Sequence, residues 1–330
     1  RARYPVQLTG YVKVGGRRSN GSSLLDFPTI MNASGATMSF PLRWLSFNES
    51  LSAEAGLRGR FETGFLKHEA VVSGSWLSIS SGASIGVTPM VTSNIYAPVN
   101  QPVPNLPVPG NVPLTSQNVL SSISLIDAMS AWDERVQLIG GVRVQSVQTS
   151  NWSGVTGLPT PGYSQSAVTP SVSLVVRPWK EFALYGNFIQ ALEQGPTAGA
   201  GTLNAGQAFA PFVSTQFEVG AKLDLGNFGA TLSAFQITRP SSFINPATNM
   251  LVVDGQQRNQ GIEFTMFGEP VKGLRPIGGF TVLSPLLTST LNGTNNGNYA
   301  PGVATFQANL GLDWDTPWVQ GLTVGGRMIY

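Results

Sequence analysis

The chain has 330 residues, and only 11% of them are charged, against roughly 25% in soluble domains. The formal net charge is +2 and the 19 lysines and arginines are dispersed, so no basic stripe predicts a nucleic-acid partner. The sequence has no cysteine, which excludes disulfide-stapled secreted domains, zinc-thiolate sites and iron–sulfur clusters, and no apolar run reaches the roughly 18 residues of a membrane helix.

Alternation of apolar and polar residues predicts thirteen strands along the chain. In the clearest case Phe217, Val219 and Leu223 share one face, while Glu218 and Lys222 share the other, because strand side chains have period two. The predicted strands span, in chain order, residues 4–14, 51–62, 67–78, 116–131, 136–148, 168–177, 182–191, 213–225, 228–239, 261–267, 274–287, 306–314 and 322–330.

The connections between these segments alternate between short and long. The short turns lie near residues 63, 133, 179, 226, 270 and 317. The long loops are expected over about residues 15–49, 79–116, 148–166, 192–212, 240–257 and 288–302. Strict alternation predicts antiparallel neighbours, with all the long loops at one end of the sheet.

Aromatic residues gather at the short turns, where a membrane barrel places its interfacial girdle. They are Phe61, Phe65, Trp132, Trp179, Phe228, Phe267, Trp314 and Trp318. Most of the predicted strands have the length that a tilted strand needs to cross a bilayer, about 9–11 residues or slightly more. The sequence therefore predicts an all-β fold, a transmembrane antiparallel β-barrel with its apolar face toward lipid.

Six stretches together resemble the C-terminal barrel of TonB-dependent outer-membrane receptors, in the siderophore-receptor branch. They are Phe61–Trp76, Leu120–Gln145, Ser173–Gly195, Ser214–Pro240, Asp254–Leu274 and Leu310–Tyr330. The resemblance implies a location in the outer membrane of a Gram-negative bacterium. It also implies import of ferric siderophores or similar chelates, energised by the TonB complex of the inner membrane.

Receptors of this family resemble a 22-stranded barrel plugged by an N-terminal domain. Residues 1–330 show no plug and no energy-coupling box, so we expect a partial barrel of about 13 of the 22 strands, drawn from its middle. Contact with TonB is then expected through an N-terminal part that lies outside this sequence. A smaller complete barrel is the alternative architecture.

The sequence contains no P-loop or HExxH motif, and no enzyme activity is expected. His68 falls on the apolar face of its strand and is expected to be a membrane-interface residue. Charges on the polar faces, such as Arg58 and Arg60, are expected to line a wet lumen. The resemblance implies that iron is held by the siderophore, so neither a metal site nor a cofactor is expected.

The long-loop end is the expected ligand side. The resemblance implies that aromatic and basic residues there bind the chelate, which is often anionic or rich in catecholate. The candidate residues, all in or beside the predicted long loops, are Arg43, Trp44, Tyr96, Trp152, Tyr163, Arg239, Phe243 and Tyr299. Two other classes compete with an active transporter: a passive porin-like channel without a plug, and a soluble all-β binding protein.

Overall fold

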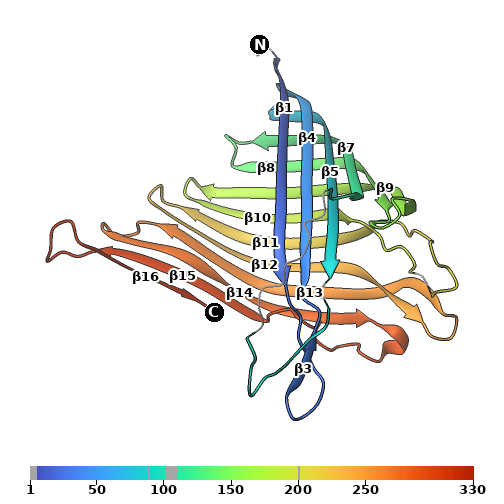
Figure 1. Cartoon of the computed structure of the whole chain (residues 1–330). Coiled ribbons are helices and arrows are strands. Elements are labelled where there is room, and N and C mark those ends of the chain that lie inside the picture. Colours follow the sequence, from blue (N-terminus) through green and yellow to red (C-terminus); the bar gives the residue numbers. More distant parts are fainter. Residues whose placement is uncertain (1–5, 88, 101–110, 200) are drawn as a thin grey trace.

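The computed structural model describes residues 6–87, 89–100, 111–199 and 201–330. These residues form one curved sheet of thirteen antiparallel strands, which confirms the expected fold class (Figure 1). Its strands, in spatial order, are β1 (Gln7–Leu25), β4 (Leu42–Thr63), β5 (Leu66–Val87), β7 (Leu114–Ala131), β8 (Val136–Trp152), β9 (Pro159–Trp179), β10 (Phe182–Glu193), β11 (Phe212–Asp224), β12 (Phe228–Asn245), β13 (Met250–Gly268), β14 (Leu274–Ser289), β15 (Phe306–Asp315) and β16 (Thr323–Ile329).

Two of the connections add a small second sheet. It consists of β2 (Thr29–Ile30), β3 (Ala36–Ser39) and β6 (Val91–Asn94), and Figure 1 shows β3 beyond the ends of β1, β4 and β5. The described residues also contain one short 3-10 helix, Leu291–Gly293. No helix among them is long and apolar enough to cross a membrane.

The strands pair in a register that places outward side chains opposite outward side chains all around the sheet. Leu57 of β4 lies opposite Val72 of β5, Val72 lies opposite Leu125 of β7, and Leu125 lies opposite Val142 of β8. All four are exposed, at 41–54%. A sheet whose exposed face is apolar is suited to lipid, so we call this the outer face and the opposite, polar face the inner face.

The strands are longer than the sequence predicted, because the outer face changes character partway along them. Beyond the level of Trp76, most outward positions are polar, as in the row Ser80 to Gln117. Where the strands extend into water, the backbone hydrogen bonds between them continue, but neither face needs to be apolar. The alternation of apolar and polar residues that predicts a strand therefore ends where the lipid ends. The other outward polar positions at these levels include Ser78, Ser121, Ser146, Gln148, Ser164 and Ser166.

Several expected loops are therefore largely strand. The connection expected over 240–257 is a four-residue turn at 246–249, and the one expected over 148–166 is 153–158. The first long loop shrinks from 15–49 to 26–41, while 192–212 and 288–302 stay close to the observed 194–211 and 290–305. The loop expected over 79–116 is also too long, because residues 79–87 belong to β5 and residues 114–116 belong to β7. Its residues 88 and 101–110 lie outside the described part.

The short turns bring aromatic rings together, as the predicted girdle requires. The ring centroids of Phe65 and Trp132 are 6.3 Å apart, and those of Trp314 and Trp318 are 5.1 Å apart.

Trp132, Asp133 and Glu134 all adopt left-handed backbone angles, with φ of 51°, 54° and 64°. Side chains of this size rarely adopt that region, so the turn between β7 and β8 stores local strain.

One ion pair at this end gives a pH-dependent prediction. Arg275 donates two hydrogen bonds to the exposed carboxylate of Asp315, at 2.7 and 2.6 Å, and Thr323 donates a third at 2.7 Å. These donors lower the pKa of Asp315 below its usual value, Arg275 having the larger effect. The pair therefore stabilises the fold above the unfolded-state pKa of about 3.9, and this contribution is lost as pH falls through the folded-state pKa.

The substitution Asp315→Asn in the full-length protein should lower the thermal unfolding temperature slightly at pH 7. The difference from wild type should shrink as the pH is lowered below about 4. Circular dichroism of the detergent-solubilised protein measures it, with Asp133→Asn at another short turn as the control. An equal difference at pH 7 and in strong acid would show that Asp315 does not act through its charge.

Candidate ligand-binding site

A bidentate ion pair stands on the inner face at the long-loop end. Arg239 of β12 donates from Nε to Oε2 of Glu193 at 2.7 Å, and from Nη2 to Oε1 of the same carboxylate. Glu193 is the last residue of β10, and both side chains are a little under half exposed. The hydrogen bonds to Glu193 raise the pKa of Arg239 and outweigh the opposing effect of burial.

The segment that follows Glu193 is anchored by a buried tyrosine. Tyr163 of β9 is only 3% exposed, and its hydroxyl accepts a hydrogen bond from the backbone N–H of Gly195 at 3.1 Å. Burial raises the pKa of this phenol. Beside it, Thr149 of β8 lies 3.3 Å from Oε1 of Gln194. Two neighbouring strands thus fix the start of the 194–211 loop.

The same loop is tied to the turn at 246–249. Asn204 exchanges two 3.0 Å hydrogen bonds with the backbone of Leu251, and Asn249 donates to the carbonyl of Gly201 at 2.9 Å. The N–H of Leu203 donates to the carbonyl of Asn249 at 2.8 Å. Residues 194–211 and 246–249 therefore form one connected element, which we call the loop–hairpin unit.

The inner wall below the long-loop end carries charges that are paired with one another. Tyr185 donates to Glu218 at 2.6 Å, and the Nζ of Lys222 lies 5.0 Å from the centroid of the Tyr185 ring. Tyr11, Glu54 and Lys13 repeat this arrangement between β1 and β4: Tyr11 donates to Glu54 at 2.8 Å, and Lys13 lies over the Tyr11 ring at 4.9 Å.

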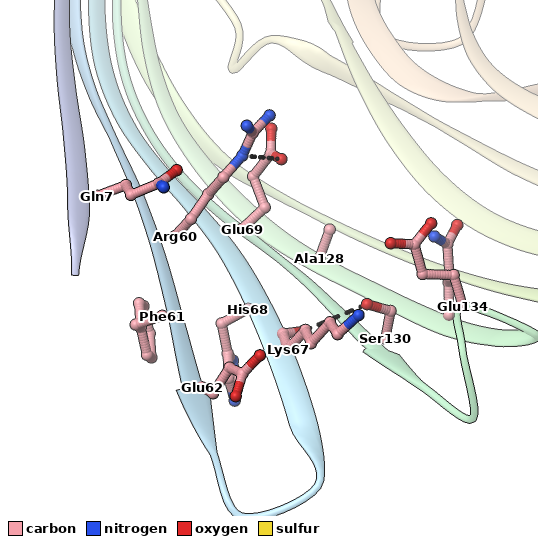
Figure 2. A pocket seen from close by; sticks show the side chains of 11 residues that line it. Gln7, Arg60, Phe61, Glu62, Lys67, His68, Glu69, Ala128, Ser130 and Glu134 are labelled. Carbon is pink, nitrogen blue, oxygen red and sulfur yellow. Dashed lines mark hydrogen bonds and ion pairs between the residues drawn. The ribbon is translucent and has the colours of Figure 1, made fainter. Parts of the chain in front are cut away.

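A cavity lies near the short-turn end, where β4, β5 and β7 approach their turns (Figure 2). Figure 2 shows Arg60 and Glu69 directed toward each other across this pocket, with Nε and Oε2 2.9 Å apart. Arg58 reaches the other oxygen of Glu69 at 3.3 Å. Glu62, Lys67 and Glu134 also line the cavity, which makes it the most highly charged of the described pockets.

Comparison with known proteins decides the family. The family model described as "TonB dependent receptor-like, beta-barrel" matches residues 3–330. The chain belongs to this family of receptor barrels. It is 36% identical over 341 residues to the ferrichrome receptor FcuA of Yersinia enterocolitica, in a match that covers 100% of this chain and 45% of FcuA.

Solved structures agree with this assignment of the receptor barrel. BauA, the ferric preacinetobactin receptor of Acinetobacter baumannii, matches with a TM-score of 0.84 and 36% identity, over 98% of this chain and 49% of BauA. The siderophore receptor PiuA of the same organism shares the fold, with a TM-score of 0.77, 18% identity, and coverage of 98% of this chain and 52% of PiuA. The chain spans about half the length of these receptors, and its barrel is an outer-membrane structure.

The structure places the eight candidate ligand-binding residues in different surroundings. Arg43 and Trp44 lie in β4 rather than in a loop, with Arg43 on the outer face and Trp44, 39% exposed, on the inner face. Trp152 and Phe243 are half-buried near strand ends, in β8 and β12. Outside the strands stand the two strongly exposed rings, Tyr96 at 76% and Tyr299 at 59%.

Among these candidates, Arg239 and Tyr163 converge on the loop–hairpin unit. Tyr163 is buried against Gly195 and holds the loop, so it is not accessible to a ligand as the sequence suggested. Arg239 lies at the long-loop end, as the sequence predicts, but its guanidinium is already hydrogen-bonded to Glu193. Sequence reasoning missed Glu193 because a lone acid at a strand end is an ordinary solvated residue until its partner, 46 positions away, is known.

His68 lies on the outer face of the receptor, as expected, but it is not isolated there. Its Nδ1 donates to Oδ2 of Asp127 at 2.8 Å, its Nε2 lies 2.6 Å from the hydroxyl of Thr63, and its ring stacks on Phe61 with centroids 4.8 Å apart. Asp127 lies opposite Ala70 on the same face. A histidine with such partners is a structural residue of the wall.

Proposed function

We propose that the complete protein is an outer-membrane receptor that imports ferric siderophores or similar chelates, energised by the TonB complex. The observation that carries the proposal is 36% identity, over all or nearly all of this chain, to proteins named as ferrichrome and ferric preacinetobactin receptors. In this proposal the siderophore holds the iron, so the protein needs no metal ligands of its own. The TonB contact belongs to a part of the protein outside residues 1–330.

The arrangement of the wall supports this role. The ordered loop–hairpin unit gives the long-loop end a fixed surface on which a chelate can dock. Below it, the inner face is lined by paired polar groups, such as Tyr185 with Glu218, which satisfy one another yet remain wettable. A ligand released from the mouth would therefore pass along a hydrated wall.

Uptake of radioactive iron tests the proposal. The complete gene, expressed in a Gram-negative strain that lacks its own siderophore receptors, should confer uptake of ferrichrome-bound or other siderophore-bound iron. Uptake should disappear when the TonB gene is deleted. Uptake that persists without TonB would indicate a passive porin-like channel instead, and recovery of the protein from buffer without detergent would rule out a membrane receptor.

A further inference from the structure

Within residues 1–330, the connections at the long-loop end are almost free of charge. The connections at that end contain a single charged residue, Asp26. The described parts of those connections are residues 26–41, 89–100, 111–113, 153–158, 194–199, 201–211, 246–249 and 290–305. The short turns at the opposite end are strongly charged, so the contrast is not a result of the low charge of the whole chain. Their charged residues include Asp133, Glu134, Arg135, Lys180, Glu181, Glu269 and Lys272.

The described strand residues at this end offer little charge toward the ligand side. Arg239 faces inward, but its Nε and Nη2 both donate to the carboxylate of Glu193, so the pair is formally neutral. Arg43 and Arg258 lie on the outer face by register. Arg17 of β1 also faces inward.

Amides and hydroxyls take the place of charges in the loop–hairpin unit. Asn204, Gln207, Thr202 and Asn249 are among its hydrogen-bonding side chains. Such neutral groups donate and accept hydrogen bonds without a counter-charge. These bonds are made within the loops themselves, so the surface that results is polar but uncharged. Such a surface suits an uncharged polar ligand, but it cannot compensate a multiply charged anion that loses its water on binding.

We propose that this mouth selects ferric chelates that carry no net charge, and that Glu193 determines this selection by cancelling Arg239. Three hydroxamate groups carry one negative charge each and neutralise Fe³⁺, whereas catecholate and citrate complexes of iron are anionic. The proposal rests on the function proposed above. It differs from the expectation, drawn from the family resemblance, that basic residues at the mouth receive an anionic chelate.

The test uses the complete receptor, purified in detergent, with tryptophan fluorescence reporting the binding of two probes. Ferrichrome is the uncharged probe and ferric citrate is the anionic one. Wild type should bind ferrichrome on the order of 10-fold more tightly or better, which corresponds to about 1.4 kcal/mol. Glu193→Gln should free the charge of Arg239 and improve citrate binding about 3-fold to 10-fold, with a gain that shrinks as salt is added.

A matched control exists on the opposite side of the wall. Glu49 pairs with Arg18 at 3.2 Å on the outer face, so Glu49→Gln removes the same charge without reaching the mouth. It should leave the affinities for both probes unchanged. Glu193→Asp, which keeps the charge, should retain the wild-type preference and shows that the site tolerates substitution.

The outcomes separate the inference from the function on which it rests. Tighter binding of ferric citrate by wild type would overturn the inference while leaving a siderophore receptor in place. Equal weakening of both probes in Glu193→Gln would also overturn it, because Glu193 would then act only as a latch for the loop. Failure of wild type to bind any siderophore, together with uptake that does not require TonB, would overturn the proposed function itself.

Discussion

Replacing His68 by alanine should destabilise the barrel by about 1–3 kcal/mol, because it leaves a carboxylate on the lipid-facing wall without its partner. Oδ1 of Asp127 is buried and, among the described residues, has no hydrogen-bond partner. The carboxylate therefore depends on the 2.8 Å contact between its Oδ2 and His68 Nδ1. The substitution also removes the ring that stacks on Phe61.

Urea-induced unfolding of the complete receptor in lipid vesicles would measure this loss. The double variant His68→Leu, Asp127→Leu provides the matched comparison, because it removes both polar groups together and restores an apolar outer face. It should recover most of the stability that His68→Ala loses. If the double variant were as unstable as the single one, the loss would come from packing rather than from an unpartnered carboxylate.

Gly195→Ala should detach the loop–hairpin unit from the wall and weaken chelate binding by roughly 10-fold, about 1.4 kcal/mol. A Cβ at this position would lie 2.1 Å from the carbonyl oxygen of Ala210 and 2.7 Å from that of Phe209. Both are backbone atoms, so the loop itself must shift. The shift would break the hydrogen bond from the Gly195 N–H to Tyr163.

Limited proteolysis of the loop and equilibrium binding of ferrichrome by the complete receptor both report this change. Gly199→Ala is the control, because a Cβ there meets nothing within 4 Å. Tyr163→Phe removes only the accepting hydroxyl and should produce a smaller effect in the same direction. Unchanged cleavage and affinity in Gly195→Ala would show that the anchor does not position the ligand surface.

The architecture of the wall could be predicted because lipid imposes a simple pattern on the sequence. The outer face must be apolar for as long as it meets hydrocarbon, so the strand pair around Phe217 and Glu218 was placed correctly. Where β4 and β12 continue into water, neither face needs to be apolar, and the pattern fades although the hydrogen-bonded ladder persists. The sequence therefore predicts loops where these strands continue.

The candidate site was less accessible to sequence reasoning because its contacts join distant parts of the chain. The charge of Arg239 makes it a candidate, but whether that charge is available to a ligand depends on Glu193, 46 residues earlier. Tyr163 is a candidate as an aromatic residue of a predicted long loop, yet its neighbours bury it. Asn204 gave no signal at all, since an asparagine in a glycine-rich segment is equally typical of a free loop.

The length of the strands has a consequence for how this receptor meets its surroundings. β4 has 22 residues, roughly 70 Å of extended chain, whereas about 9–11 residues cross the bilayer. The remainder stands above the membrane as a collar with a serine- and glutamine-rich outer surface. The turn at 153–158 lies at the end of this collar farthest from the membrane, and Val155 in this turn is 96% exposed. It is therefore the place where an epitope tag could be inserted, or an antibody could bind intact cells, without disturbing the anchored mouth.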